Sequence, residues 1–229
     1  DCNYRGWQST GHCCPAAEFV KQVRRGQRNW FENYNFNFDY SIYLRADKAV
    51  KSGYAGTTFN QVDLDKSIKS AASELEILKR DPITIKPGKY RVYLAPAALS
   101  ELVEMLGWGG FGLKSHKTKG SCITKMVSEG WKFSDMVTMM ENTKDGLAPD
   151  FSSDGFKKPD AVTMIKKGVH NDYLISPRSA KEFDVETNGA GGSEGFSSFD
   201  LAAGKLCADS AASDLELEFI SIIFVRKFL

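Results

Sequence analysis

The sequence has no long apolar run, no surplus of one charge and no paired cysteine framework. Its best apolar run, "FISIIFV" at 219–225, falls far short of the roughly 18–20 residues that span a bilayer. A net charge of +1 argues against a dedicated nucleic-acid-binding protein. Five cysteines, an odd number, do not suit a secreted disulfide scaffold, so we expect a protein of the reducing cytoplasm.

The sequence is also poor in recognisable metal motifs. Its three histidines, His12, His116 and His170, lie far apart, and none stands in an H-E-x-x-H arrangement. His12 with Cys13 and Cys14 forms a candidate group of metal ligands. Adjacent cysteines lack the C-x₂-C geometry of common zinc sites, however, so incidental thiols are the favoured interpretation of this cluster.

Other groups that could carry chemistry lack a supporting context. The basic segment Lys114–Gly120 reads as a loop that could contact a phosphate, but it lacks the spacing of a phosphate-binding loop. Ser121 and Cys122 lie beside these lysines, and nothing local marks either as an activated nucleophile. Four carboxylates are candidates for a general acid and base pair: Asp150, Asp154, Asp160 and Glu182. The residues alone therefore identify no strong catalytic site.

The first half of the chain predicts two strands and a helix. Apolar side chains occupy every even position from Tyr34 to Leu44, which predicts a long strand with one buried face. Residues 48–60 predict a second, antiparallel strand. Residues 64–80 predict a helix with Asp65 as N-cap, and its apolar positions are Ile68, Ala72, Leu75 and Leu78. Residues 16–25 predict a short helix.

The second half predicts shorter elements. We expect a strand at Tyr90–Leu94, a helix over 97–106 that ends in glycines, and a loop-dominated stretch over 111–160 with a strand within 134–142. Residues 161–176 predict a hairpin, followed by a helix with Ser176 as N-cap and Pro177 at its first position. The last segment, 213–229, fits either a helix or a strand. Together these elements predict an α+β fold with mainly antiparallel sheets.

Several segments, in order from about 29 to 206, resemble the TldD/PmbA family, whose members are known as modulators of gyrase and as zinc-dependent peptidases. Residues 33–60 resemble the strand pair of the family, and residues 67–106 resemble the start of its C-terminal domain, "G-x-y-x-V-x-L-x-P-x-A". The most specific pieces resemble the family's "F-D-x-E-G", "L-I-x-x-G-V-L", "R-(S/T)-A" and "N-G-A" segments; they are Phe151–Phe156, Ile165–Leu174, Arg178–Ala180 and Thr187–Ala190.

The resemblance implies a two-domain protein with a sheet-rich, barrel-like C-terminal part. On this basis we assign residues 1–83 to the remnant of an N-terminal α/β domain with its linking helix, and residues 84–229 to an incomplete C-terminal domain. Family members are considerably longer than this chain. The acidic-glycine and "N-G-A" pieces give candidate substrate-chamber residues: Asp154, Gly155, Asn188 and Gly189.

One kind of family subunit carries H-E-x-x-x-H, in which both histidines hold zinc and the glutamate acts as base. The other, PmbA-like kind lacks this motif and pairs with the first. Aligned without gaps from Val92–Leu94, the three motif positions fall here on Glu104, Met105 and Gly109. Glycine has no side chain and a thioether is a poor zinc ligand, so the resemblance implies a chain without its own metal or catalytic residues.

The sequence therefore favours a metal-free, PmbA-like partner of a zinc-bearing TldD-like subunit, or of a second copy of itself, in the cleavage of unfolded peptides. Two alternatives remain open. One is an active hydrolase that uses the Asp154-Gly155 segment or Cys122. The other is a module that binds a protein or a nucleic acid through Lys114–Lys119, although the near-neutral net charge disfavours nucleic acid.

Overall fold

The computed structural model describes residues 2–4, 7–24, 27–84, 86–90, 92–94 and 96–204. The chain divides into two compact units, and the main division falls inside a helix, between Ala98 and Leu99. Both units combine helices with antiparallel sheets, so the predicted α+β class is confirmed. None of the helices in the described part of the chain combines the length and the apolar character that crossing a bilayer requires.

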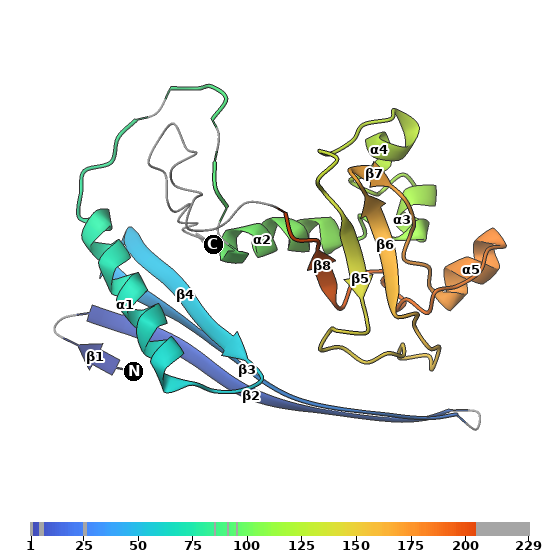
Figure 1. Cartoon of the computed structure of the whole chain (residues 1–229), viewed down its shortest axis with the longest axis horizontal. Helices are drawn as coiled ribbons and strands as arrows, with labels where there is room; N and C mark the ends of the chain where they lie inside the picture. The colour runs from blue at the N-terminus through green and yellow to red at the C-terminus, as the bar shows by residue number, and fades with distance from the viewer. Residues whose placement is uncertain are drawn as a thin grey trace. The chain divides into compact units, whose positions relative to one another are not determined.

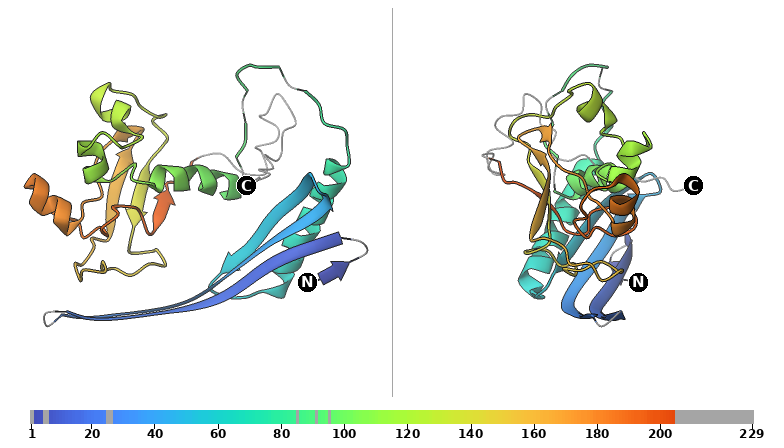
Figure 2. Two further views of the ribbon diagram at one scale, coloured as in Figure 1. Left: turned by 180° about the vertical axis from the view of Figure 1, so that it is seen from behind. Right: turned by 90° about the vertical axis from the view of Figure 1, so that its right-hand side faces the viewer.

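The first unit is built on a four-stranded sheet in the order β1-β2-β3-β4. Its elements are β1 (Cys2–Tyr4), most of β2 (Trp7–Arg24), most of β3 (Gln27–Arg45), β4 (Lys48–Gly56) and helix α1 (Gln61–Leu78). Strands β3 and β4 pair antiparallel, as predicted, and α1 runs along one face of the sheet (Figures 1 and 2).

The predicted alternation in β3 places its apolar face under α1. Tyr40 is buried together with Val50 of β4 and with Ala71 and Leu75 of α1. Three further β3 side chains pack against this cluster at alternate positions, namely Phe38, Ile42 and Leu44. Period-two burial on one face of a strand is therefore what joins the sheet to the helix.

Helix α1 begins earlier than the sequence predicts, and its buried face keeps only Leu75 and Leu78 of the four predicted apolar positions. Its N-cap is Asn60, whose Oδ1 accepts a hydrogen bond from Val62 N at 3.0 Å, and not Asp65. Ala71 is buried in place of Ala72, and Ile68 is 40% exposed. Successive residues of a helix point about 100° apart. Burial of Ala71 in place of Ala72 therefore turns the buried face to one side of the predicted one.

Two other predicted elements are wrong. Residues 16–24 belong to β2 and form no helix, because pairing of β2 with β3 overrides the local pattern. Tyr90 and residues 92–94 form no strand, since no strand lies alongside to pair with them in the described chain. Instead the Tyr90 hydroxyl donates to the carbonyl of Lys86 at 2.6 Å, a local contact within a turn.

The second unit is built on a four-stranded sheet in the order β7-β6-β5-β8, with β5 and β6 at its centre (Figure 1). Its elements are α2 (Pro96–Gly107), α3 (Leu113–Lys117), α4 (Thr124–Ser128), β5 (Met139–Asn142), β6 (Ala161–Lys166), β7 (Val169–His170), α5 (Pro177–Phe183) and β8 (Phe199–Leu201). The predicted hairpin and the predicted Ser176 cap of α5 are confirmed.

Two features of this unit differ from, or extend, the sequence prediction. The stretch 111–160 contains the short helices α3 and α4 as well as β5, and the basic segment predicted as a loop is largely α3. The four strands in the described residues form an open sheet, so the barrel-like closure implied by the resemblance stays a prediction. The assignment of a domain boundary at 83/84, and the character of residues 213–229, which lie outside the described residues, also stay predictions.

The core of the second unit lies between its sheet and the segment that follows α2. Phe111 and Ile123 pack with Met139 of β5 and with Val162 and Met164 of β6. Phe196, which precedes β8, covers the edge of this cluster, together with Leu106 at the end of α2. The core therefore fixes the end of α2 and the loop before β8 on the same sheet.

We expect Leu75→Ala to destabilise the first unit by about 2–5 kcal/mol, because Leu75 is fully buried and its removal leaves a cavity. Ile68→Ala, on the same helix but 40% exposed, is the control and costs less than about 1 kcal/mol. Urea unfolding followed by far-UV circular dichroism compares the two. Equal losses would contradict the observed face of α1.

Candidate functional site

Helix α2 ends in a tight turn of glycines, as its sequence predicts. Gly110 N donates to the carbonyl of Leu106 at 2.9 Å, which closes the last turn of the helix. Gly109 has a φ of +83°, in the left-handed region that favours glycine at a helix end. A Cβ built on Gly109 would lie 2.6 Å from Ser115 Oγ. Backbone conformation and close packing thus both require glycine at this point.

The residues at the three zinc-motif positions do not fit a zinc ion. Glu104 and Met105 are exposed on α2, and a thioether is a poor zinc ligand. Gly109 lies beyond the end of the helix and has no side chain. Elsewhere, too, the described residues contain no group of three or more His, Cys, Asp or Glu side chains that could hold a metal. The absence of zinc on this chain stays a prediction.

A buried carboxylate lies in the loop between α5 and β8. Glu194 is 2% exposed, and its own N–H closes a turn onto the carbonyl of Gly191. Its Oε2 accepts a hydrogen bond from Lys114 N at 2.8 Å. Its Oε1 accepts from the N–H and the hydroxyl of Ser176, both at 2.9 Å. We call this set of contacts the Glu194 clamp.

The Glu194 clamp joins the beginnings of two helices. The N-cap of α3 is Gly112, which has no side chain to cap the helix, and the Glu194 carboxylate supplies the missing acceptor. At α5 the Ser176 hydroxyl accepts from Ser179 N while it donates to Glu194. Negative charge at a helix N-terminus is favourable, so one carboxylate serves both. A Cβ on Gly112 would lie 2.9 Å from that of Glu194, which explains this glycine.

A second buried carboxylate, Glu141 of β5, lies beside a buried lysine. The Glu141 oxygens accept hydrogen bonds from Ser197 N and Ser198 N at 2.9–3.1 Å. Lys158 Nζ stands 3.9 Å from Glu141 Oε1, and the two side chains are only 9% and 5% exposed. The Lys158 amine also donates to Ser197 Oγ at 3.3 Å. Glu141 is thus satisfied mainly by backbone N–H groups, and Lys158 is only its distant ion-pair partner.

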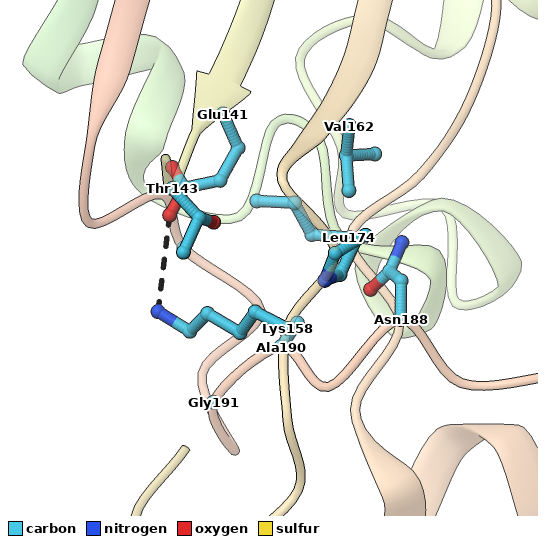
Figure 3. A pocket seen from close by; sticks show the side chains of 10 residues that line it. Glu141, Thr143, Lys158, Val162, Leu174, Asn188, Ala190 and Gly191 are labelled. Atoms are coloured by element: carbon cyan, nitrogen blue, oxygen red, sulfur yellow. Dashed lines mark ion pairs between the residues drawn. The ribbon is translucent and has the colours of Figure 1, made fainter. Parts of the chain in front are cut away.

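Lys158 lies between two hollows of the second unit. The smaller, drawn in Figure 3, has a cavity volume of about 10 Å³, room for one water-sized group, and is lined by Glu141, Thr143 and Asn188 among others. The larger, about 240 Å³ and more open, is walled by Phe151 and Phe196 with several serines. Both are lined by Lys158, so its side chain connects them.

The candidate substrate-chamber residues lie near these hollows. Asn188 lines the smaller hollow. Its side-chain amide also forms hydrogen bonds with the segment before α5: Nδ2 donates to Tyr173 O at 2.7 Å, and Oδ1 accepts from Ile175 N at 2.8 Å. Gly189 lies against the carbonyl of Lys157, where a Cβ would come within 2.7 Å. The structure therefore brings the segment 187–190 beside the base of the loop that ends at Lys158.

Asp154 and Gly155 form the other candidate chamber pair. Asp154 is exposed at the tip of a turn that closes through Gly155 N onto Ser152 O at 2.9 Å. Of this turn, Ser152 and Ser153 line the larger hollow, whereas Asp154 does not. Of the general acid and base candidates, Asp150 and Asp160 supply backbone carbonyls to Lys158 N and Lys144 N, and Glu182 is exposed on α5. The structure thus assembles no carboxylate pair from these residues.

Two histidines that are far apart in sequence lie around one tyrosine. The ring centres of His116 and His170 lie 5.0 and 4.2 Å from that of Tyr173. Burial, and then the charge of His116, lower the pKa of His170, while Asp172 opposes the shift. Nδ1 of His116 and Nε2 of His170 are buried without a hydrogen-bond partner in the described chain. Burial likewise raises the pKa of Tyr173.

Cys122, the candidate nucleophile, is an exposed free thiol. No hydrogen bond joins its sulfur to His116 or His170. The side chains of His12, Cys13 and Cys14 lie outside the described residues.

The sequence interpretation missed Glu141, Lys158 and Glu194. For Glu141 a signal exists, because it stands two residues from Met139 and the period of a strand places both on one face. Lys158 follows another lysine and carries no such signal. Glu194 lies among glycines and serines, where only the path of the loop brings its carboxylate inside.

Comparisons with known proteins agree with this architecture. Residues 87–220, more than half of the chain, match the family model of the PmbA/TldA metallopeptidase C-terminal domain. A candidate modulator of a DNA gyrase from Thermotoga maritima has a similar solved structure, with a TM-score of 0.63, 19% identity, and coverage of 78% of this chain and 42% of that one.

Two further solved structures are similar. A candidate modulator of DNA gyrase from Bacteroides thetaiotaomicron has a TM-score of 0.58 at 18% identity, covering 78% of this chain and 41% of its own. TldE from Thermococcus kodakarensis has a TM-score of 0.61 at 13% identity, covering 82% and 45%. At these identities the likeness shows the fold, and the chain spans less than half the length of these proteins. A comparison with curated protein sequences found no match.

We expect Glu194→Gln to lower the free energy of unfolding by about 1–3 kcal/mol, because the amide replaces an acceptor with a donor that faces backbone N–H groups. Glu186→Gln, at an exposed position in the same loop region, is the matched control and has little effect. Thermal unfolding measures both. An unchanged midpoint for Glu194→Gln would refute the clamp.

The His170 arrangement predicts a pH dependence of stability. Its folded-state pKa lies below the ordinary 6.5, so the unfolded chain takes up its proton first as the pH falls through about 6.5, and the free energy of unfolding decreases. His170→Gln is expected to show a smaller decrease between pH 7 and 5. His116→Gln removes one cause of the shift and gives an intermediate slope. Urea unfolding at several pH values measures these slopes; identical slopes in all three proteins would contradict the burial of His170.

Proposed function

Because the chain belongs to the PmbA/TldD metallopeptidase family, we propose that it serves as a metal-free partner subunit in peptide cleavage. In this proposal a TldD-like subunit supplies zinc and the general base. The present chain supplies part of the wall of the substrate chamber. The TldE likeness supports the fold on which the proposal rests, and the role itself is our inference.

The observation that carries the proposal is the end of α2. At the places where a zinc-bearing relative has histidine, glutamate and histidine, this chain has Glu104, Met105 and Gly109. The last of these is held in a left-handed turn with Ser115 Oγ occupying the space of its Cβ. A side chain at 109 would therefore need both the turn and Ser115 to move. This opposes a zinc ligand at 109 more strongly than the change of residue type alone.

The contribution of the chain to a substrate is then one of shape and hydrogen bonding. In the described residues β8 lies at one edge of the second sheet, and the loop that precedes it walls the larger hollow. An extended peptide adds readily to a free sheet edge through backbone hydrogen bonds. A peptide that lay along this side of the unit would pass close to the hollow and its serine hydroxyls.

The test is affinity purification of the tagged chain from its native source. We expect an H-E-x-x-x-H protein to purify with it, peptide cleavage only in the complex, and zinc only on the partner, as measured by elemental analysis of the separated subunits. Stoichiometric zinc on the isolated chain would overturn the proposal. So would cleavage of unfolded peptides by the chain alone that is lost in Asp154→Ala or Cys122→Ala.

A further inference from the structure

The Lys158 side chain is largely buried, and its amine is poorly matched by acceptors. An ammonium has three N–H donors, and a buried cation is costly unless these are satisfied. The side chain is 9% exposed, yet its contacts are one 3.3 Å hydrogen bond to Ser197 Oγ and an ion pair at 3.9 Å. A well-formed charged hydrogen bond is nearer 2.7–2.9 Å. Lys158 thus holds donor capacity that its protein neighbours use weakly.

A second polar group at the same place is also unmatched. Thr143 Oγ1 lines the smaller hollow and has no hydrogen-bond partner in the described part of the chain. Figure 3 shows the Lys158 side chain crossing the hollow with its amine toward Glu141 and Thr143. An ammonium and a hydroxyl beside a space of about 10 Å³ fit one ligand oxygen.

The charge balance favours a monoanion. Glu141 is held mainly by the N–H groups of Ser197 and Ser198 and lies 3.9 Å from Lys158, so the ammonium keeps donors for one further acceptor, while the Glu141 charge would repel a dianion more strongly than a monoanion. The larger hollow adds room of about 240 Å³ with the aromatic walls of Phe151 and Phe196. This space has room for a side chain next to a carboxylate, where it would meet two aromatic rings and several serines.

We propose that the two hollows around Lys158 bind the carboxylate of a peptide, with the Lys158 ammonium and the Thr143 hydroxyl on one carboxylate oxygen and the neighbouring side chain between Phe151 and Phe196. This inference rests on the proposed function in taking a peptide as the ligand. It adds a specificity to that function, because peptide substrates or products would be bound through one of their own carboxylates. Lys158 is a binding residue in this scheme and takes no chemical step.

The experiment is isothermal titration calorimetry on the intact chain, and on its complex with the zinc-bearing partner where one purifies. The probes are Ala-Ala-Phe as the free acid and as its C-terminal amide. We expect the acid to bind at least about tenfold more tightly, because the amide loses a charge-assisted hydrogen bond. Equal affinities, or no binding of the acid at millimolar concentration in either preparation, would overturn the proposal.

Two further probes identify the source of the carboxylate. Ala-Glu-Ala amide carries only a side-chain carboxylate, whereas Ala-Ala-Phe acid, whose binding the proposal requires, carries only the terminal one. If Ala-Ala-Phe alone binds, the site reads a chain terminus; if the glutamyl peptide binds as well, it reads any peptide carboxylate. Inorganic phosphate is the competitor, and tighter binding of phosphate than of both peptide acids would refute the proposed monoanion site.

The variant Lys158→Met should abolish the preference for acid over amide, and Lys158→Arg should retain part of it. Lys157→Met, at the exposed neighbouring position, is the matched control and should bind like the unaltered chain. Circular dichroism checks that each variant is folded. An acid preference that persists in folded Lys158→Met would overturn the assignment.

A further variant protects the test against a failure of Lys158→Met to fold. Thr143→Val removes a buried hydroxyl that has no partner, so it should leave stability unchanged or raised. It should nevertheless weaken binding of the acid by several-fold and leave the amide unaffected. Unchanged acid binding in Thr143→Val would contradict the site. Because these titrations detect binding directly, their failure is distinct from a failure to find a zinc-bearing partner.

Discussion

The second unit depends on one buried carboxylate. Three hydrogen bonds to Glu194 hold the start of α3, the start of α5 and the loop before β8 to one another. Without it Lys114 N, in the first turn of α3, would lose its acceptor, and the N–H and hydroxyl of Ser176 would lose the acceptor that they share. The same loop continues into Ser197, whose N–H bonds to Glu141. Gly191 and Gly195 of the loop that carries Glu194 line both hollows around Lys158.

The parts of the fold that the sequence predicted are those in which one periodic face meets one neighbour. Residues 38–44 of β3 alternate as predicted and their buried side packs on α1, whereas Tyr34 of the predicted face is 58% exposed. The prediction failed where a second element decides the outcome. Ala71, in place of Ala72, faces the sheet because Ser67 of α1 reaches Tyr40 and so sets the rotation of the helix. Tyr90 and residues 92–94 have the composition of a strand, but no strand pairs with them in the part of the chain that the structure describes.

The candidate site was predictable to a smaller degree. Sequence likeness alone brought the segments around Asp154 and Asn188 into one hypothesis, and the structure places Gly189 beside the loop that ends at Lys158. Of the buried charges, only Glu141 could have been recognised, from the alternation of its own strand. The burial of Lys158 depends on Glu141, Ser197 and two loops that meet only in the folded chain. Local pattern contains no information about such contacts.

The left-handed turn at Gly109 has a consequence for how this chain can change over time. A histidine placed there would meet Ser115 and an unfavourable φ at once, so the first step toward a metal site costs stability and gives no ligand set in return. The exposed carboxylate of Glu104 and thioether of Met105 would have to change as well. Several coordinated substitutions separate this chain from a zinc-bearing one. The left-handed backbone at Gly109, and not only the residue types, thus opposes a metal site at this helix end.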